Sequence, residues 1–334
     1  MRRIAVLGGG SWGTALTIVL SRAHKAHEIS WWVRDAALAE SIHGERENKL
    51  YLPGHKIPET VRVSHDAAAV LEDAGVVIGA IPAAHARNVY VHILPHLLPG
   101  ASIVSASKGL EPSSHARVSE VISQIVTPKF AHRIAVLSGP SFAAEVAAGQ
   151  PTAVVLASRD VALANELQED FAAPNFRLYT NEDVLGVELA GAMKNVIAIA
   201  AGACQGLGLG SNPLAALITR GLAEMTRLAT TLGARQETLS GLAGLGDLVL
   251  TCTGWLSRNR RVGIELGQGR SLPAILAEMK MVAEGVGTAG ALLALAGESD
   301  VELPITEQVE AILHQGRSPR EAIRSIMERP LKRE

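Results

Sequence analysis

Residues 4–16 read IAVLGGGSWGTAL. The run from Ile4 to Leu7 is short and apolar, which is typical of a buried strand. Gly8 to Gly10 end that run, and apolar residues then recur at helical spacing from Ser11 onward. The stretch therefore predicts a strand, a tight glycine turn and a helix that begins directly after the turn.

The glycines Gly8, Gly10 and Gly13 form a G-x-G-x-x-G pattern within this turn. In a dinucleotide-binding fold the first glycine makes the turn, the second lets the backbone approach the pyrophosphate, and the third lets the helix pack on the strand. The free N–H groups of the helix N-terminus also favour phosphate. The pattern alone is weak, because glycine turns are common. Its place between a strand and a helix, with a second strand expected at residues 28–33, favours a nucleotide site over a plain turn.

The end of that second strand bears on the choice of cofactor. NAD-selective folds place an acidic residue there against the ribose hydroxyls, whereas an arginine accommodates the 2′-phosphate of NADP. This chain has Val33, Arg34 and Asp35 in succession. Arg34 favours NADPH, with an exposed surface arginine as the alternative, and Asp35 keeps NADH open.

The first half of the chain alternates short apolar runs with Ala/Leu-rich helical stretches. Strands are expected at residues 3–7, 28–33, 76–81, 101–107, 133–139 and 152–158. This alternation predicts βαβ units, a mostly parallel sheet and a Rossmann-type α/β domain over residues 1–185.

From about Asp183 the β-branched runs nearly vanish, which predicts a helical C-terminal domain over residues 186–334. Residues 183–208 are expected to form one long helix. The next helix is expected to have Asn212 as its cap and Pro213 at its first position.

Composition excludes several classes of protein. A formal net charge of −2 over 334 residues gives no general attraction to nucleic acid or anionic lipid. Cys204 and Cys252 lie far apart and in no metal-ligand spacing, and a disulfide between them is disfavoured. The N-terminal apolar run is too short for a signal-peptide core. We expect no apolar segment of membrane-spanning length and a cytoplasmic location. The sequence leaves the oligomeric state open, with a homodimer as one option, because nothing in it fixes an interface.

Polar residues follow two of the predicted strands. Lys108 comes after the strand at residues 101–107, at its carboxyl end, where open α/β sheets bind their ligands. Gly139 and Ser141 follow the strand at residues 133–139 and precede a helix. We expect all three at the ligand site. A solvated loop lysine and a helix-capping serine are the alternatives.

Lys194 lies in the middle of the long predicted helix, among small and aliphatic residues on all faces. Burial disfavours the charged form and lowers the pKa of a lysine toward a range useful for proton transfer. Lys194 is therefore a candidate general acid/base, and a structural lysine that snorkels to solvent is the alternative. Asn195 is adjacent, and Glu188 lies nearly two turns earlier.

The segment at residues 241–263 reads GLAGLGDLVLTCTGWLSRNRRVG. Asp247 is a lone carboxylate in apolar, glycine-rich surroundings. Hydroxyl, amide and guanidinium donors then cluster in Ser257–Arg261, which favours a phosphate site. For Arg260 and Arg261 a solvated basic surface is the stronger reading.

Other chemistries find little support in the sequence. The histidines are scattered, and the close pair His92 and His96 spans Pro95, which disrupts helical spacing, so we expect no metal site. No serine sits in a nucleophile-elbow setting. Hydride transfer assisted by a lysine needs neither feature.

Several of these motifs, taken in order, resemble those of the bacterial NAD(P)-dependent glycerol-3-phosphate dehydrogenases. They are GGGSWGTAL, SASKGLE, SGPSFAAEV, ELAGAMKNVIAIAAG, GLGDLVLTCT with SRNRR, and VAEGVGTA. The match runs from residue 4 to about residue 285. The resemblance implies interconversion of sn-glycerol 3-phosphate and dihydroxyacetone phosphate for phospholipid synthesis.

The resemblance also assigns site residues, with Lys194 as the general acid/base. The implied substrate contacts are Lys108, Gly139, Ser141, Lys194, Asp247, Ser257, Arg258 and Asn259. The implied cofactor contacts are Gly8, Gly10, Ser11, Trp12, Gly13, Arg34, Lys108, Ala143, Arg258, Val282 and Glu284. Trp12 stands where the family often has tyrosine or another aromatic residue. Arg34 carries over less directly than Lys194, because the end of the second strand varies across the family.

Two other readings share parts of this pattern. A β-hydroxyacid or 6-phosphogluconate-type dehydrogenase also joins a nucleotide domain to a helical domain and uses a lysine on a long helix. Asp247 and the SRNRR cluster argue against it. A non-catalytic dinucleotide sensor that regulates DNA would need a basic recognition helix, which the chain lacks.

Overall fold

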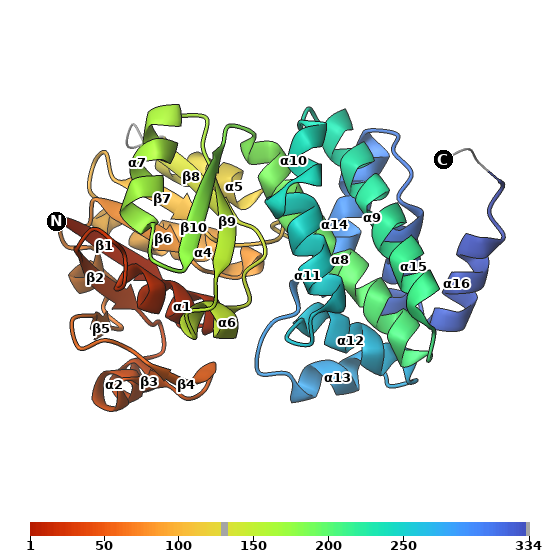
Figure 1. Ribbon diagram of the computed structural model, residues 1–334, viewed down its shortest axis with the longest axis horizontal. Coiled ribbons are helices and arrows are strands. Elements are labelled where there is room, and N and C mark those ends of the chain that lie inside the picture. The colour runs from red at the N-terminus through yellow and green to blue at the C-terminus, as the bar shows by residue number, and fades with distance from the viewer. Residues whose placement is uncertain (128–132, 332–334) are drawn as a thin grey trace. The chain divides into compact units, whose positions relative to one another are not determined.

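The computed structural model describes residues 1–127 and 133–331. It contains two compact units (Figure 1). Unit 1 comprises Met1–Glu111 and Ala116–Glu188, and unit 2 comprises Pro112–His115 and the chain from Leu189 onward.

Unit 1 is built on an eight-stranded sheet with the order β10-β9-β8-β7-β6-β1-β2-β5. Its strands are β1 (Arg2–Leu7), β2 (His27–Trp32), β5 (Arg62–Ser64), β6 (Val76–Gly79), β7 (Ser102–Ser105), β8 (Arg133–Ser138), β9 (Thr152–Ala157) and β10 (Phe176–Asn181). All neighbouring strands are parallel except β8 and β9, which are antiparallel. The predicted mostly parallel sheet is confirmed.

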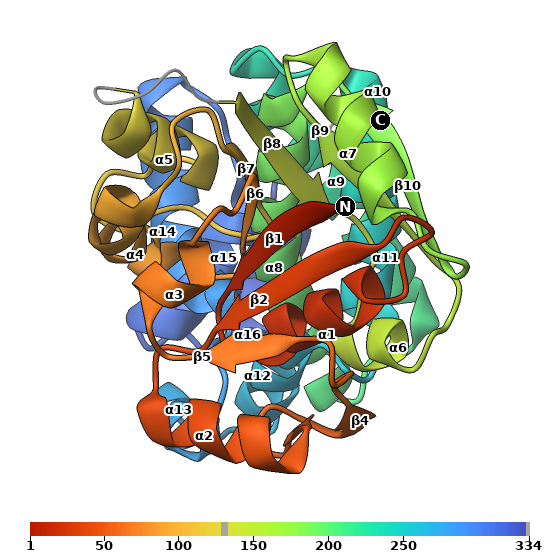
Figure 2. The ribbon, with the colours of Figure 1, turned by 90° about the vertical axis from the view of Figure 1, so that its left-hand side faces the viewer.

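Helices cover both faces of this sheet (Figure 2). They are α1 (Ser11–Leu20), α2 (Ala36–Glu45), α3 (Ala67–Leu71), α4 (Ala86–Ile93), α5 (Val118–Val126), α6 (Ala143–Ala147) and α7 (Val161–Phe171), with the short 3-10 helices η1 (Ala83–His85) and η2 (Leu94–His96). In β1, Ile4 and Val6 join the core with α1 and α7, while Ala5 and Leu7 join the core with α3, α4 and α5. Because both faces are buried, the strand is a continuous apolar run rather than an alternating one.

The order of the strands reverses between β1 and β6. From β1 the chain runs outward through β2 to β5, then crosses back to β6 and continues through β7 to β8. Open α/β sheets bind their ligands beside the carboxyl ends of the strands at such a reversal. The glycine turn after β1 lies at this point.

Two strands of the sheet, β5 and β10, were not expected from the sequence. β5 is three residues long, too short for a periodic signal. β10 is an edge strand whose exposed Arg177 and Tyr179 alternate with buried apolar residues, so it lacks an apolar run. A small antiparallel pair, β3 (Glu47–Asn48) with β4 (Leu52–Lys56), was missed as well.

Unit 2 is helical, as predicted. Its elements are α8 (Val184–Gly206), which begins in unit 1, α9 (Ser211–Thr231), α10 (Gln236–Ser240), the short π-helix η3 (Leu242–Gly246), α11 (Asp247–Thr253), α12 (Arg258–Gly267), α13 (Leu272–Glu278), α14 (Glu284–Glu298), α15 (Pro304–His314) and α16 (Pro319–Met327). The expected long helix is α8. The expectation that Asn212 caps the next helix is wrong: α9 begins at Ser211 after Gly210, whose backbone is extended. Pro213 then lies in the first turn, where backbone N–H groups have no intrahelical partner.

The expectation that no segment reaches membrane-spanning length is wrong for α8. The helix has 23 residues, and its most apolar window has a mean hydropathy of 1.6. That window is 89% buried inside the protein. A helix that is apolar on all faces is typical of the core of a large protein as well as of a membrane span.

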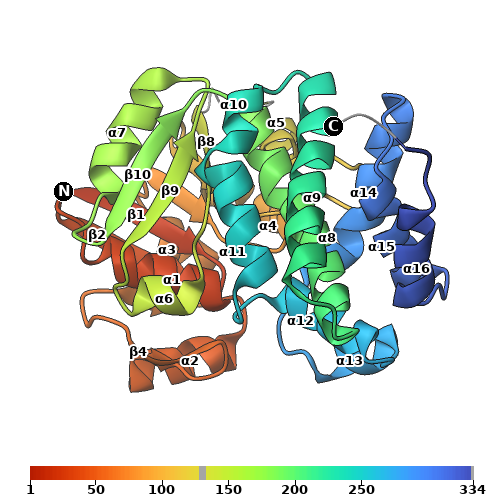
Figure 3. The same ribbon diagram turned by 45° about the vertical axis from the view of Figure 1, so that its right-hand side comes forward.

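Helices α8 and α12 approach each other closely at glycines (Figure 3). A Cβ atom on Gly263 would lie 2.0 Å from the carbonyl oxygen of Ile199, and one on Gly202 would lie 2.0 Å from that of Arg260. The two backbones are therefore in direct contact. This contact packs α12 against the C-terminal half of α8, and a hydrogen bond from Asn259 to Asn195 places the first turn of α12 beside the neighbour of Lys194.

Candidate active site

The glycine turn forms the cradle that the sequence predicts. Gly8 has a φ of +118°, and a Cβ there would lie 2.4 Å from the carbonyl oxygen of Ala80, after β6. A Cβ on Gly13 would lie 2.0 Å from the carbonyl oxygen of Gly8. By contrast, a Cβ on Gly10 would meet nothing within 4 Å. The first and third glycines are thus required by packing, while the space in front of the second is open, which fits a pyrophosphate.

The residues after β2 differ in their roles. The Asp35 carboxylate accepts a hydrogen bond from the backbone N–H of Leu38 at 2.8 Å and so caps α2. Arg34 is exposed and forms no ion pair with any residue in the described ranges. Asp35 therefore stabilises a helix terminus, whereas the Arg34 side chain has no such structural role within the described residues.

Trp12, in the first turn of α1, packs against the core of unit 1. Its indole N–H is buried and has no hydrogen-bond partner within residues 1–127 and 133–331. A buried donor without a partner is unusual in a folded protein. Like the open space at Gly10, the unsatisfied indole N–H of Trp12 is consistent with a ligand site at the glycine turn.

Three of the predicted substrate residues lie together in unit 1. The Lys108 ammonium donates to the carbonyl oxygen of Gly139 at 2.8 Å and to the Ser141 hydroxyl at 3.4 Å. The Ser141 hydroxyl donates to the same carbonyl at 2.9 Å. Gly139 has a φ of +122°, which favours glycine. The alternative that Ser141 caps the following helix is wrong, because the N-cap of α6 is Phe142.

Lys194 lies in unit 2 with its ammonium group buried. The side chain is 7% exposed, and Nζ donates to the Asp247 carboxylate at 2.7 Å and to the Thr251 hydroxyl at 2.8 Å. The Thr251 hydroxyl in turn donates to the carbonyl oxygen of Asp247 at 2.6 Å. The snorkelling alternative is therefore wrong. The ammonium is held by a charged partner and a hydroxyl inside the protein.

The local fold explains this arrangement. Asp247 is the first residue of α11 and follows the π-helix η3. Thr251 lies four residues later, so both side chains are on one face of the helix. A Cβ on Gly244 would lie 1.9 Å from the carbonyl oxygen of Leu239, so the tight entry to α11 needs a glycine. Thr251 was not among the predicted site residues, although its position four residues after Asp247 places it on the same helix face.

The first turn of α12 carries the next predicted residues. The buried Ser257 hydroxyl accepts from the backbone N–H of Arg260 at 3.2 Å and so caps the helix. Burial lowers the pKa of the Arg258 guanidinium, and the nearby Glu284 carboxylate opposes this effect. The guanidinium of Arg258 makes no hydrogen bond to another residue of the described chain. Arg261, by contrast, is an exposed residue paired with Glu265 at 2.8 Å, as a solvated surface residue would be.

Asn259 joins three helices. Its Nδ2 donates to the side-chain Oδ1 of Asn195 on α8 at 2.9 Å, and its Oδ1 accepts from the backbone N–H of Gly285 on α14 at 2.9 Å. Asn195 also donates to the carbonyl oxygen of Gly191 at 3.3 Å. Asn259 is thus a link that fixes α12 and α14 against the neighbour of Lys194. Only one of its amide hydrogens is left for a ligand.

Comparison with known proteins places this geometry in a family. The model of the N-terminal domain of NAD-dependent glycerol-3-phosphate dehydrogenase matches residues 3–164, and the model of its C-terminal domain matches residues 183–324. The chain belongs to the NAD-dependent glycerol-3-phosphate dehydrogenase family.

Relatives within this dehydrogenase family match the chain over nearly its whole length. A glycerol-3-phosphate dehydrogenase [NAD(P)+] of Koribacter versatilis is 54% identical over 331 residues, covering 99% of this chain and 98% of the relative. One of Acidobacterium capsulatum is 53% identical over 335 residues, covering 99% of each. The crystal structure of the Coxiella burnetii glycerol-3-phosphate dehydrogenase superposes with a TM-score of 0.93 at 41% identity, covering 98% of each chain.

The remaining predicted residues of this family member lie at the start of α14. Glu284 is its first residue, and Val282, two residues earlier, is 48% exposed. Near Lys194, burial raises the pKa of the Cys252 thiol to about 12, so this cysteine is inert at neutral pH. Within the described residues no group of three or more His, Cys, Asp or Glu side chains is arranged to hold a metal ion.

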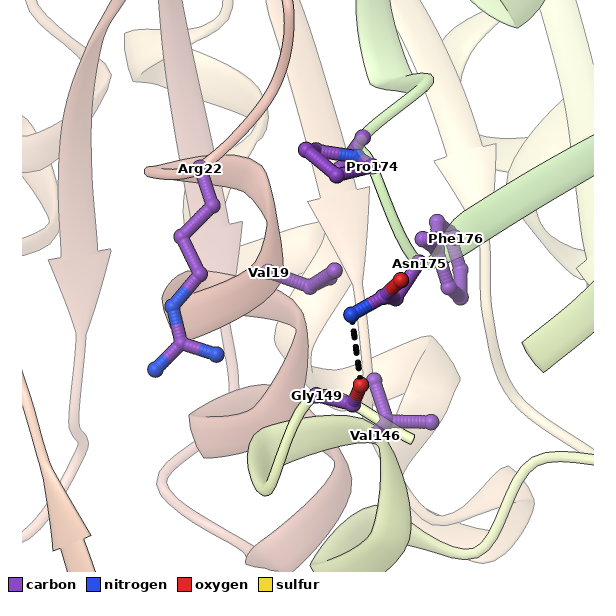
Figure 4. Close-up of a pocket in the computed structure, with 8 residues that line it drawn as sticks. Val19, Arg22, Val146, Gly149, Pro174, Asn175 and Phe176 are labelled. Atoms are coloured by element: carbon purple, nitrogen blue, oxygen red, sulfur yellow. Dashed lines mark hydrogen bonds between the residues drawn. The ribbon is translucent and has the colours of Figure 1, made fainter. Parts of the chain in front are cut away.

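A small pocket of about 160 Å³ lies in unit 1, away from the glycine turn (Figure 4). It is lined by Val19, Arg22, Val146, Gly149, Ala173, Pro174, Asn175 and Phe176. Asn175 donates to the carbonyl oxygen of Gly149 at 2.8 Å across its mouth. The pocket contains no predicted site residue and lies beside the C-terminal end of α1, whereas the cradle lies at the N-terminal end.

Proposed function

We propose that this chain is an NAD(P)-dependent sn-glycerol-3-phosphate dehydrogenase. It interconverts sn-glycerol 3-phosphate and dihydroxyacetone phosphate, and its product feeds phospholipid synthesis. The relatives carry the name glycerol-3-phosphate dehydrogenase [NAD(P)+]. The observation that carries the proposal is the buried Lys194 ammonium, held at 2.7 Å by Asp247 and at 2.8 Å by Thr251.

Lys194 is the general acid/base of the proposed reaction. During reduction of the ketone, Nζ donates a proton to the carbonyl oxygen while the adjacent carbon receives a hydride. The Asp247 carboxylate and the Thr251 hydroxyl orient the ammonium, and the carboxylate compensates its charge. In the reverse direction Nζ accepts the proton from the alcohol. Holding a charged donor where an alkoxide develops stabilises the transition state.

The nucleotide is proposed to bind at the glycine turn of unit 1. When bound, its reduced nicotinamide supplies the hydride. The residues proposed to hold it are Gly8, Gly10, Ser11, Trp12, Gly13, Arg34, Lys108, Ala143, Arg258, Val282 and Glu284. The open space before Gly10 and the unpartnered indole of Trp12 support this assignment. Because Asp35 caps a helix and Arg34 is exposed, we infer a preference for NADPH over NADH.

The phosphate of the substrate needs several donors. Arg258 supports this role, because it is half-buried and its guanidinium makes no hydrogen bond within the described residues. A guanidinium presents paired N–H groups that match a phosphate. The residues proposed to contact substrate are Lys108, Gly139, Ser141, Lys194, Asp247, Ser257, Arg258 and Asn259. No metal ion is part of the proposal.

Unit 1 is proposed to be the NAD(P)-binding domain and unit 2 the domain that carries the acid/base and the phosphate donors. We also propose a cytoplasmic location and a homodimer. The high burial of α8 supports a protein that does not insert into a membrane.

The test is the absorbance of NADPH, and separately of NADH, after dihydroxyacetone phosphate is added to the purified protein. Rapid oxidation of either nucleotide supports the proposal. A panel of β-keto acids and 6-phosphogluconate, the latter with NADP+, serves as the control. Turnover of a panel compound without turnover of dihydroxyacetone phosphate would refute the substrate assignment.

A further inference from the structure

The glycine turn is held from outside by Asn48, a fully buried residue on β3. Its Nδ2 donates to the carbonyl oxygen of Gly9 at 2.9 Å and to the Thr14 hydroxyl at 2.8 Å. Thr14 in turn donates to the carbonyl oxygen of Gly10 at 2.8 Å. The Gly10 carbonyl oxygen also accepts from the backbone N–H of Thr14 at 3.0 Å. The Asn48 amide therefore holds the Gly9 carbonyl directly, and it holds the Thr14 hydroxyl as a second donor to the Gly10 carbonyl.

The preceding carbonyl group is also fixed by a side chain. The indole N–H of Trp31, on β2, donates to the carbonyl oxygen of Gly8 at 2.9 Å. Trp31 is fully buried, so this donor has little freedom to move. All three carbonyl groups from Gly8 to Gly10 are thus directed toward the protein.

This arrangement determines where the N–H groups of the turn point. In a trans peptide, the carbonyl of one residue and the N–H of the next point in opposite directions. Fixing the carbonyls of Gly8–Gly10 therefore turns the N–H groups of Gly9, Gly10 and Ser11 away from those donors. Within the described chain, the Gly9 and Gly10 N–H groups make no backbone hydrogen bond outside regular elements. Successive N–H groups directed outward form an anion-binding concavity.

The segment that carries Asn48 is itself rigid. Arg46 has a φ of +53°, and its guanidinium donates to the carbonyl oxygens of Ile57 at 3.3 Å and Val61 at 3.0 Å. The side-chain Oδ1 of Asn48 accepts from the backbone N–H of Tyr51 at 3.2 Å. Both polar atoms of the Asn48 amide are therefore hydrogen-bonded, Nδ2 to the glycine turn and Oδ1 to its own segment, which restricts the position of the amide.

We propose that Asn48, acting through Thr14, is a positioning residue that sets the affinity of the turn for the nucleotide pyrophosphate. The inference rests on the proposed function, because it deepens the role of the same glycine turn. Asn48 touches neither the proposed acid/base nor the proposed substrate donors in the described contacts. Its effect should therefore fall on nucleotide binding and not on the chemical step.

The experiment compares Thr14→Val, Thr14→Ser and Asn48→Ala with the unmodified protein. Valine has the shape of threonine but cannot relay the hydrogen bond to Gly10, whereas serine can. Thr14→Val loses two side-chain hydrogen bonds and Asn48→Ala loses three. We expect each variant to raise the KM for NADPH about tenfold. The kcat at saturating nucleotide and the KM for dihydroxyacetone phosphate should stay within about twofold, and Thr14→Ser should restore the nucleotide KM.

Ser158→Ala is the matched control for stability. The buried Ser158 hydroxyl donates to the carbonyl oxygen of Ile134 at 2.8 Å and accepts from the backbone N–H of Asp160 at 3.2 Å, so the variant loses two side-chain hydrogen bonds in the same unit, as Thr14→Val does. This variant should lower Tm and leave the nucleotide KM unchanged. An unchanged nucleotide KM in Thr14→Val, whether or not Asn48→Ala folds, would overturn the inference. An increase of equal size in Ser158→Ala would do the same.

The same variants are also titrated with NADPH alone, with tryptophan fluorescence as the readout. This titration needs no turnover. If the unmodified protein binds NADPH but does not reduce dihydroxyacetone phosphate, the proposed function fails while the dissociation constants still decide the role of Asn48. If it reduces the ketone and the variants bind NADPH normally, the inference about Asn48 fails alone.

Discussion

Replacing Lys194 with methionine should abolish turnover and also destabilise unit 2. Methionine fills a similar volume but removes the ammonium that lies 2.7 Å from the buried Asp247 carboxylate. The Asp247 side chain is 1% exposed, so bulk water does not replace the lost ammonium. Removing one member of a buried ion pair is costly.

The size of the effect follows from the geometry. At 2.7 Å and an effective dielectric constant of about 20, the attraction between the two charges is about 6 kcal/mol. Desolvation offsets much of this, and removing one partner of a buried pair typically costs about 3–5 kcal/mol. For a unit of this size that loss lowers Tm by about 10 °C.

The assay combines thermal unfolding, followed by circular dichroism, with NADPH oxidation. A second variant, Lys194→Met with Asp247→Asn, also removes the negative charge of the buried carboxylate. It should recover most of the lost Tm without recovering turnover. Arg261→Met is the control, because its exposed pair with Glu265 contributes under about 1 kcal/mol. The reasoning is refuted if the double variant melts no higher than the single one. Turnover of Lys194→Met within about tenfold of the unmodified protein would remove Lys194 from the chemistry.

Three further predictions concern other parts of the chain. In initial-rate assays, Arg34→Leu should raise the KM for NADPH about tenfold and leave the KM for NADH unchanged. An equal change in the two KM values would show that Arg34 does not contact the 2′-phosphate. Burial raises the pKa of Glu224 to about 7, above its ordinary 4.5, so its contribution to stability is full below about pH 4.5 and is lost as the pH rises through 7. Between pH 5 and 8 the Tm of the unmodified protein should therefore fall relative to Glu224→Gln, and parallel curves would refute this. Gly263→Ala should cost about 1–3 kcal/mol in urea unfolding, because its Cβ would meet the carbonyl oxygen of Ile199, whereas Gly287→Ala, with open space, should be neutral or stabilising.

The sequence predicted those parts of the fold that have a strong local pattern. The turn from Gly8 to Gly13 and the long helix α8 have local signals, namely glycine spacing and apolar content. The edge strand β10 was missed because it has no continuous apolar run: only Phe176 and Leu178 are buried, and this alternation is short. Its pairing with β9, which lies 24 residues earlier in the chain, stabilises it as a strand, and such pairing cannot be read from local sequence.

In the candidate site, too, residues with a local sequence signal were predicted and residues that depend on tertiary contacts were not. Lys194 stood out because a lysine in an apolar helix is unusual. Thr251 did not, since a threonine in a helix is common and its role depends on where α8 passes. Asn48 gave no signal at all, because its partners lie 34 and 39 residues earlier in the chain. A residue such as Asn48 is found only when the tertiary contacts are known.

The reversal of strand order beside β1 has a consequence for synthesis of the chain. Ile4 pairs with Val76, which follows it by 72 residues. At about 5–20 residues per second, a translating ribosome needs roughly 4–14 seconds to supply that partner. Gly8 packs against the carbonyl group of Ala80, which emerges later still. The nascent chain therefore carries its most recognisable motif from the start, but the phosphate cradle can form only after the first quarter of the protein has left the exit tunnel.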